Sequence, residues 1–369
     1  MKFICSKSNL LTGVQTVAKA VPSKTTMSIL ECILVEADSN KIVLTANDME
    51  LGIETVIEGD VKVSGKIALD AKIFLEIVRK LPDNDITIET DDNNKTTITC
   101  EKAKFNIIGK SGDDFSCLPT IEKKDPLVIS QYTLKESVRQ TIFSISDNDN
   151  NKLMTGELFE INNNELKVVS LDGHRISIRK IKLKNSYPFK KTVVPGKTLN
   201  EISKILSGDM EKDVYIYFSE KHIIFEFDNT TVVSRLIEGE YFKIDQMLSN
   251  DYETKVRINK KELLSCIDRA TLLVKEGDKK PIIINIVDGS MELKMNSAVG
   301  SMNEEIDIVK QGKDLMIGFN PKFLIDALKV IEDEEIDMYL VNPKAPCFIR
   351  DEEGKYIYLI LPVNFTTVS

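Results

Sequence analysis

The chain has no tryptophan, two histidines and six cysteines among 369 residues, and these scarcities exclude several classes of protein. Two histidines, with cysteines that form no CxxC pair, leave no ligand spacing for a structural zinc site. Scattered cysteines in a chain of this length are typical of reduced thiols in the cytosol. No apolar run approaches the roughly 18 residues of a membrane span, and the N-terminus becomes polar too early for a secretory signal. The sequence therefore predicts a cytoplasmic protein with no metal site and no membrane contact.

Motifs for nucleotide binding and catalysis are also missing. Neither GxGxxG nor GxxxxGK[ST] occurs, so nucleotide-binding α/β folds are poor candidates. Asp172 and His174 could in principle form an acid–base pair, but no nucleophile or second carboxylate accompanies them in the sequence. Asn47–Met49 occupies the corresponding place about 125 residues earlier, which favours a partly architectural role for this polar turn. We predict no catalytic residue and no cofactor, and we keep a hydrolase or transferase using Asp172 and His174 as the less favoured alternative.

What the sequence does contain is a unit repeated three times. Each copy begins with a short strand and an amphipathic helix, which is anchored by Leu10, Leu134 or Leu263. A second helix recurs with Lys72, Lys197 and Lys322 spaced 125 residues apart. Solenoid repeats are roughly 20–50 residues long, so this period corresponds to whole domains. The sequence predicts three domains with the bounds 1–126, 127–250 and 251–369.

Short strands and turn residues lie between the predicted helices. Residues 85–90 and 96–99, for example, flank the turn Asp91–Asn94 and are typical of a hairpin. Strands that follow one another through short turns favour antiparallel pairing over βαβ units. We therefore predict an α+β fold of three repeated domains, each an antiparallel sheet with two helices.

The distribution of charge is uneven. The predicted helical segments are 8–21, 71–80, 133–145, 196–206, 260–274 and 321–331. Together they carry a net charge of +7, which leaves −16 for the remainder of a chain whose total is −9. If these helices share one face, that face would attract a phosphate backbone without reading sequence. The alternative is that the cations decorate solvated helix faces.

The C-terminal run from Tyr356 to Val363 is strongly apolar. It is typical of a last buried strand, and Pro362 should end that strand because proline cannot donate to a ladder. Leu361, Pro362 and Val363 would then be free to line a surface groove. An apolar groove with a polar rim is typical of a peptide-binding site.

Segments along the full length resemble the bacterial DNA polymerase III β subunits, the replicative sliding clamps. These segments are Met1–Phe3, Met27–Leu30, Asp113–Phe115, Leu171–Ile176, Val193–Lys197, Ile317–Asn320 and Leu359–Val363. The combination of Asp-Gly-His-Arg with the terminal Leu-Pro-Val is the specific part of the pattern. The resemblance implies a non-enzymatic processivity factor, a head-to-tail homodimer forming a six-domain ring around double-stranded DNA of any sequence. Such a ring tethers the replicative DNA polymerase.

The resemblance also implies three sets of functional residues. The residues expected to face DNA are Lys24, Arg79, Asn148 and Lys197. The dimer interface is expected to join Lys102, Lys104, Phe105 and Ile107 of one chain to Leu272, Leu273, Glu304 and Glu305 of the other. The groove for short peptides of polymerase, clamp loader and repair proteins is expected to comprise Met154, Leu171, Gly173, His174, Arg175, Ile176, Phe242, Met247, Pro346, Leu359, Ile360, Leu361, Pro362 and Val363. His174 and Arg175 would form its polar rim.

The sequence departs from the family pattern at several positions. In the stretch 241–246, Phe242 and Gln246 stand in place of the usual proline and basic residue, and Asn364 replaces a terminal arginine before the tail 365–369. Ser28 and Ser116 stand where proline is usual, and Gly196 replaces a basic residue of some relatives. A clamp-like paralogue with an accessory role therefore remains an alternative.

Overall fold

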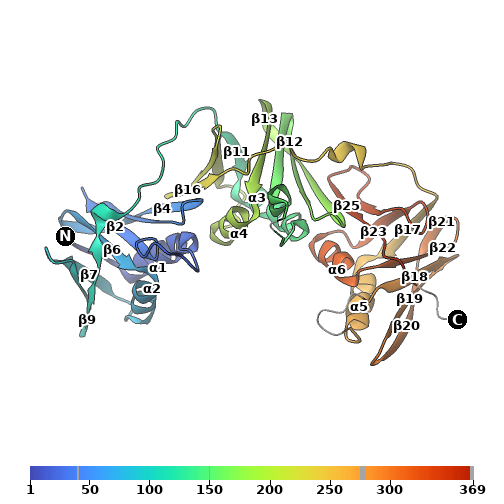
Figure 1. Ribbon diagram of the computed structural model, residues 1–369, viewed down its shortest axis with the longest axis horizontal. Helices are drawn as coiled ribbons and strands as arrows, with labels where there is room; N and C mark the ends of the chain where they lie inside the picture. The colour runs from blue at the N-terminus through green and yellow to red at the C-terminus, as the bar shows by residue number, and fades with distance from the viewer. Residues whose placement is uncertain (40, 149, 275–279, 366–369) are drawn as a thin grey trace. The chain divides into compact units, whose positions relative to one another are not determined.

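The structure is a computed structural model that describes residues 1–39, 41–148, 150–274 and 280–365 (Figure 1). Within these residues the chain forms two compact units. Unit 1 comprises Met1–Lys135 and Lys197–Leu236, and unit 2 comprises Glu136–Gly196 with the described residues from Ile237 onward. The middle repeat is therefore divided between the two units, and the division into domains 1–126, 127–250 and 251–369 stays a prediction.

Unit 1 contains two antiparallel sheets. In spatial order, the nine-stranded sheet consists of β10 (Lys110–Ser111), β6 (Gly65–Asp70), β2 (Cys32–Asp38), β3 (Lys41–Asn47), β4 (Leu51–Glu58), β16 (Thr230–Arg235), β15 (His222–Phe227), β14 (Asp213–Phe218) and β11 (Leu127–Ser130). The five-stranded sheet consists of β5 (Asp60–Val63), β1 (Lys2–Ser6), β7 (Asp85–Thr90), β8 (Lys95–Cys100) and β9 (Ala103–Ile108). Helices α1 (Lys7–Val17) and α2 (Ala71–Lys80) pack side by side (Figure 1).

Unit 2 also contains two antiparallel sheets. The seven-stranded sheet consists of β12 (Gly156–Leu171), β13 (Arg175–Pro195), β25 (Tyr356–Ile360), β24 (Cys347–Arg350), β23 (Glu335–Leu340), β17 (Thr254–Asn259) and β21 (Val309–Gly312). The four-stranded sheet consists of β20 (Gly300–Asp307), β19 (Ser290–Ser297), β18 (Ile282–Val287) and β22 (Leu315–Phe319). Helices α5 (Lys260–Thr271) and α6 (Pro321–Val330) pack against each other.

The predicted threefold repeat and α+β class are confirmed. The second helices α2, α4 (Gly196–Ile205) and α6 begin 125 residues apart, and α3 (Gln131–Arg139) takes the place of α1 and α5. The first helices end earlier than predicted. The chain continues past α1 and α3 as the 3₁₀ turns Ala18–Ala20 and Ile142–Ser144, and Thr141, at φ −129°, lies between α3 and its turn.

Polar caps explain where these helices begin. Ser6 accepts a hydrogen bond from the amide of Asn9, and Asn259 accepts one from the amide of Glu262. Asp70 and Asn320 cap α2 and α6 in the same way. Because the first amides of a helix have no partner within it, such side chains fix its start.

A lysine of the first helix secures the end of the second helix in each repeat. Lys7 Nζ donates to the carbonyl of Leu81 at 2.5 Å, and Lys260 Nζ donates to that of Ile331 at 2.6 Å. In the middle repeat, Lys135 Nζ donates to the carbonyl of Leu206 at 2.9 Å. The last carbonyls of a helix lack hydrogen-bond donors and form the negative end of the helix dipole. The lysine ammonium supplies both a donor and a positive charge at this end. We call these three contacts the lysine tethers.

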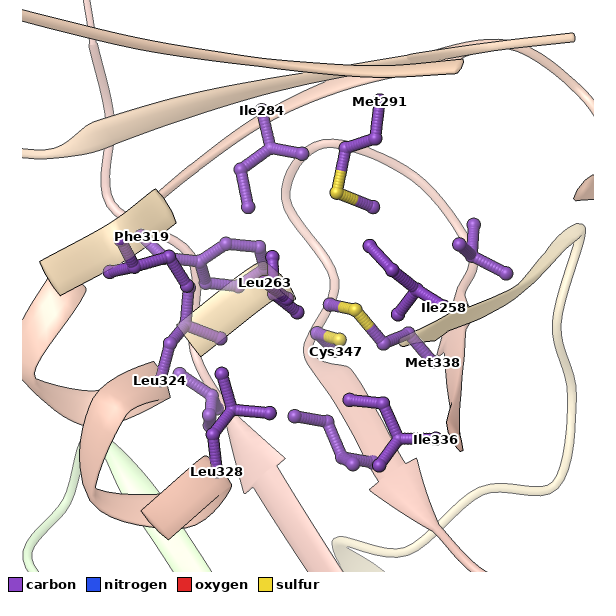
Figure 2. Close-up of a cluster of buried hydrophobic side chains, with 14 of the residues drawn as sticks. Ile258, Leu263, Ile284, Met291, Phe319, Leu324, Leu328, Ile336, Met338 and Cys347 are labelled. Atoms are coloured by element: carbon purple, nitrogen blue, oxygen red, sulfur yellow. The ribbon is translucent and has the colours of Figure 1, made fainter. Parts of the chain in front are cut away.

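The apolar run of β25 is explained by burial on both faces. Tyr356, Tyr358 and Ile360 belong to the core beneath α5 and α6, where the side chains labelled in Figure 2 pack together. Ile357 and Leu359, with the opposite orientation, belong to a second apolar cluster that includes Leu171, Ile176 and Tyr241. A strand covered on both faces has no reason to alternate with polar residues.

A carboxyl group is buried in unit 2 without a hydrogen-bond partner. Glu157, on β12, has no exposed surface, and neither carboxyl oxygen is paired. Thr141 is adjacent, but its hydroxyl donates to the carbonyl of Ser137 at 2.7 Å and can offer Glu157 only an acceptor. Burial raises the pKa of Glu157 from 4.5 to about 8, so the group is held protonated.

We predict that Lys260→Met destabilises unit 2, because the C-terminal carbonyl of α6 loses its charged donor. The expected cost is about 1–3 kcal/mol. Urea unfolding followed by circular dichroism measures it, and Lys261→Met, at the next and exposed position, is the matched control. Equal midpoints for the two variants would contradict a stabilising tether.

We predict that Glu157→Gln makes the protein more stable than wild type above pH 8. The folded state keeps the Glu157 proton to about pH 8, whereas the unfolded chain releases it near pH 4.5. The stability that this group contributes is therefore complete below pH 4.5 and is lost as pH rises toward 8. The thermal midpoint of Glu157→Gln should exceed that of wild type by about 2 °C or more at pH 9. A wild-type advantage at pH 9 would refute this.

Candidate functional site

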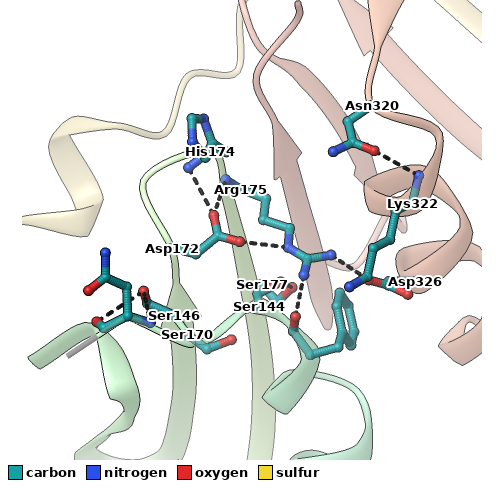
Figure 3. A network of polar contacts seen from close by, with 12 residues as sticks. Ser144, Ser146, Ser170, Asp172, His174, Arg175, Ser177, Asn320, Lys322 and Asp326 are labelled. Atoms are coloured by element: carbon teal, nitrogen blue, oxygen red, sulfur yellow. Dashed lines mark hydrogen bonds and ion pairs between the residues drawn. The ribbon is translucent and has the colours of Figure 1, made fainter. Parts of the chain in front are cut away.

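The turn between β12 and β13 is held by one carboxylate. Asp172 Oδ1 accepts the amides of His174 at 2.9 Å and Arg175 at 3.1 Å. Gly173, between Asp172 and His174, has φ +88°, a left-handed conformation that favours glycine. The sequence Asp-Gly-His-Arg thus specifies a tight turn that presents the His174 side chain to solvent (Figure 3).

Arg175 is buried and holds the turn to neighbouring elements. Its Nε donates to Asp172 Oδ2 at 3.0 Å, its Nη1 donates to Asp326 of α6 at 2.7 Å, and its Nη2 donates to the carbonyl of Phe143 (Figure 3). The guanidinium carbon also lies 4.5 Å from the ring centre of Phe323. With a residue exposure of 6%, Arg175 cannot serve as a rim cation, so that prediction was wrong.

The geometry does not pair Asp172 with the imidazole of His174. Asp172 is engaged by two backbone amides and by Arg175, and its contact with His174 is made through the backbone. The His174 ring stacks on Phe323, with ring centres 6.1 Å apart and planes 22° apart. The arrangement therefore gives no support to an acid–base pair at this position.

An apolar cavity of about 420 Å³ lies beside this turn. Its floor is formed by the buried side chains of Leu171, Ile176 and Leu359, and its outer edge by Met247 and Leu361, which are 46% and 36% exposed. The cavity is lined by Met154, Leu171, Gly173, His174, Arg175, Ile176, Phe242, Met247, Pro346, Leu359 and Leu361. We call it the β13–β25 groove, because the paired strands β13 and β25 cross its floor.

Three residues predicted for the groove are not among those that line it. Ile360 points to the opposite face of β25, into the core beneath α5 and α6, because neighbours on a strand alternate sides. The chain beyond Leu361 then turns away, and the amide of Val363 donates to the carbonyl of Gly318 on β22 at 2.8 Å. Pro362 and Val363 therefore follow the four-stranded sheet rather than the groove, and residues 366–369 of the tail lie outside the described residues.

The residues predicted to face DNA are all exposed, but two of them are ion-paired. Arg79 pairs with Glu76 one turn earlier in α2, with Nη1 2.6 Å from Oε1. Lys197, at the start of α4, pairs with Asp48. Lys24 and Asn148 lie in loops. The charges of Arg79 and Lys197 are therefore partly neutralised.

The residues predicted for the dimer interface lie on or beside two edge strands. β9, with Lys104, Phe105 and Ile107, ends the five-stranded sheet, and Lys102 precedes it. β20, with Glu304 and Glu305, ends the four-stranded sheet of unit 2. Leu272 is 81% exposed, whereas Leu273 packs partly against the core. Glu304 is bound by Arg269, whose hydrogen bonds lower the pKa of that carboxyl.

In the described part of the chain, no group of three or more His, Cys, Asp or Glu side chains could hold a metal ion. Among the same residues, no helix is both long and apolar enough to cross a membrane.

The residues that hold Arg175 in place beside the groove were not predicted from the sequence. Phe143, Phe323 and Asp326 fix Arg175, yet nothing in their spacing points to that turn. Asp326 lies 151 residues away from Arg175 in sequence. The only available signal was indirect, since an arginine inside an apolar segment requires a carboxylate partner somewhere.

Comparison with known proteins identifies related chains over the full length. Three family models match in order: the N-terminal, central and C-terminal domains of the DNA polymerase III beta subunit, at residues 1–119, 128–243 and 245–364. The beta sliding clamp of Staphylococcus aureus is 32% identical over 375 residues, with 99% of each chain covered.

Solved structures agree with the sequence relatives. A putative DNA polymerase III beta subunit from Eubacterium rectale is 73% identical, with a TM-score of 0.96 over 99% of this chain and 100% of that one. The DNA polymerase sliding clamp of Bacillus subtilis is 34% identical, with a TM-score of 0.95 and the same coverage. The Asp-Gly-His-Arg turn, the groove beside it and the threefold repeat thus lie in a chain that belongs to the DNA polymerase III beta subunit family.

Proposed function

We propose that this protein is a DNA sliding clamp, a ring that encircles duplex DNA and tethers the replicative polymerase for processive synthesis. The family match along the whole chain carries the proposal. The groove beside the Asp172 turn supports it, because a tether needs a place to hold its partners. The ring itself is not catalytic, and the chemistry belongs to the polymerase it holds.

The helical surfaces are suited to loose contact with phosphates. Several helix cations are paired with a carboxylate on their own helix, as Arg139 is with Glu136 and Lys204 is with Glu201. Exposed ion pairs of this kind are weak and yield readily to other partners. A surface of weakly held cations attracts any phosphate backbone without reading bases. Enclosure, and not tight binding, would then keep the protein on DNA.

The two edge strands support a head-to-tail homodimer. β9 and β20 each present one unpaired edge within the described residues, and such an edge is a template for pairing with another chain. Lys102 and Lys104 would face Glu304 and Glu305 of a second copy, and Phe105 and Ile107 would pack against Leu272 and Leu273. A heterologous contact that closes on itself forms a ring.

The groove is suited to short extended peptides with an apolar anchor. Its floor is apolar, while the His174 imidazole at its edge is exposed and can bond to a polar peptide group. Sites of this shape bind through one or two buried side chains. Peptide segments of the polymerase, the clamp loader and repair proteins are the proposed ligands.

We predict that Leu361→Ala or His174→Ala weakens peptide binding about tenfold or more, because each removes contact area or a polar partner from the groove edge. The measurement is fluorescence anisotropy with a labelled peptide from the clamp-binding segment of the replicative polymerase. Met210→Ala, at an exposed methionine of unit 1, is the control. Unchanged affinity in both groove variants would disprove the assignment.

We predict that Leu272→Ala combined with Leu273→Ala yields monomers, since the interface loses its apolar anchors while circular dichroism still reports a folded chain. Wild type, loaded onto nicked circular DNA by the clamp loader, should stay bound in high salt and leave once the DNA is linearised. The variant should not be retained on either DNA. Phe189→Ala, at an exposed position of β13, should behave as wild type.

Two outcomes would contradict the ring. The first is a dimer mass for the double variant in analytical ultracentrifugation. The second is equal loss of wild type from circular and linear DNA in high salt, which would mean that charge alone had held it. Loader-dependent processivity with the replicative polymerase would in addition separate the main clamp from an accessory paralogue.

A further inference from the structure

The turn that borders the groove has a close counterpart in unit 1, 124 residues earlier. The segment Asn47–Gly52, from the last residue of β3 to the second residue of β4, matches Leu171–Ile176 in length and in hydrogen bonding. Asp48 Oδ1 accepts the amides of Glu50 at 3.0 Å and Leu51 at 2.7 Å, as Asp172 does for His174 and Arg175. Met49 has φ +76°, which is close to the +88° of Gly173.

The strands beside the two turns also correspond. Gly52 pairs with Val233 across β4 and β16, and Ile176 pairs with Leu359 across β13 and β25. The amide of Arg235 donates to the carbonyl of Glu50 at 2.8 Å. The amide of Leu361 likewise donates to the carbonyl of His174 at 2.9 Å. The framework of the groove is therefore built twice.

The cavity enclosed by the unit 1 copy of the framework is almost completely filled by side chains. The cavity at this position measures about 80 Å³, against about 420 Å³ for the β13–β25 groove. It is lined by Asn47, Met49, Glu50, Leu51, Gly52, Ser116, Cys117, Leu118, Pro119, His222 and Val233. We call it the β4–β16 groove. Residues 116–119 correspond to residues 242–245 at the larger groove, because the offset of 126 that relates Val233 to Leu359 also relates Ser116 to Phe242.

The residue that fills this groove is Leu118. A Cβ added to Gly52 would lie 2.1 Å from Leu118 Cδ2, so the leucine side chain rests on the bare backbone of Gly52. The corresponding residue in the larger groove, Ile176, covers that place with its own side chain. Asn47 Nδ2 also donates to the carbonyl of Ser116 at 2.8 Å, which holds the segment against the turn.

We propose that residues 116–119 are a built-in ligand of the β4–β16 groove, with Leu118 as its apolar anchor, and that they close this groove to external peptides. The segment crosses the groove without helix or strand pairing, as an extended peptide ligand would. Its attachment to the chain gives it a high effective concentration, so a free peptide cannot compete. The proposal depends on the proposed function only for calling the larger groove a peptide site.

The test asks whether removing the anchor opens the groove to the same sequence supplied in trans. The probe is a synthetic peptide with the sequence of residues 113–122, serine in place of Cys117 and photo-leucine in place of Leu118. It is irradiated with full-length Leu118→Gly and with wild type, both carrying Leu361→Ala to weaken the other groove. Mass spectrometry should find crosslinks to residues 47–52 at least about tenfold more often in Leu118→Gly.

Gly52→Ala supplies the matched control. Gly52 does not need a left-handed φ, so alanine suits its backbone, but the new methyl group occupies the place of the leucine. Adding Gly52→Ala to Leu118→Gly should abolish the crosslinks. Equal labelling of wild type and Leu118→Gly would overturn the proposal, as would labelling that survives Gly52→Ala.

A second measurement applies if Leu118→Gly proves unstable. Gly52→Ala alone should lower the thermal midpoint because it expels Leu118, and Leu118→Ala should remove most of that penalty in the double variant. Penalties that simply add would show that the two residues do not share the groove. Neither experiment involves DNA or a polymerase, and Leu361→Ala only weakens competing binding at the larger groove, so each experiment can fail independently of the clamp function.

Discussion

Backbone pairing across the repeats is the constraint on which the rest of the structure depends. The ladder between β4 and β16 joins the first repeat to the second, and the ladder between β13 and β25 joins the second to the third. Each makes one continuous sheet from strands of two repeats. Because a ladder fixes register residue by residue, the turn just before β4 or β13 is set against the neighbouring repeat. A groove forms at each ladder for this reason, and the side chains added there decide whether it is open or filled.

Arg175 makes the site at the ladder between β13 and β25 rigid. Its three hydrogen-bonding directions reach Asp172, Asp326 and Phe143, so the turn, α6 and the segment after α3 are connected through one buried guanidinium. A buried arginine without partners would cost several kcal/mol, and here the partners are supplied by carboxylates and a carbonyl. The groove floor thus has little freedom to rearrange, so a ligand binds without a large entropic cost of ordering the floor.

Much of this architecture could be predicted from the sequence, and the misses have physical reasons. The 125-residue spacing of Lys72, Lys197 and Lys322 located the second helices because each copy must bury the same helix face. The resemblance to clamps identified the residues that line the cavity, but not the orientation of Ile360, which depends on which face of β25 meets α5 and α6. The sharing of sheets between repeats escaped prediction because strand patterns do not reveal partners far apart in sequence. The correspondence of Asn47–Met49 with the Asp172 turn was visible from spacing alone, whereas the occupation of its groove by Leu118 required coordinates.

The lysine tethers have a consequence for movement along DNA. Lys135 and Lys260, both counted in the positive sum of the helices, are committed to helix-end carbonyls. With the helices facing DNA as proposed, the exposed cations that remain would each gain or lose a phosphate at small energetic cost. A ring with this surface would have a nearly flat potential along the duplex axis, and its one-dimensional diffusion would be limited by drag from the solvent more than by electrostatic friction.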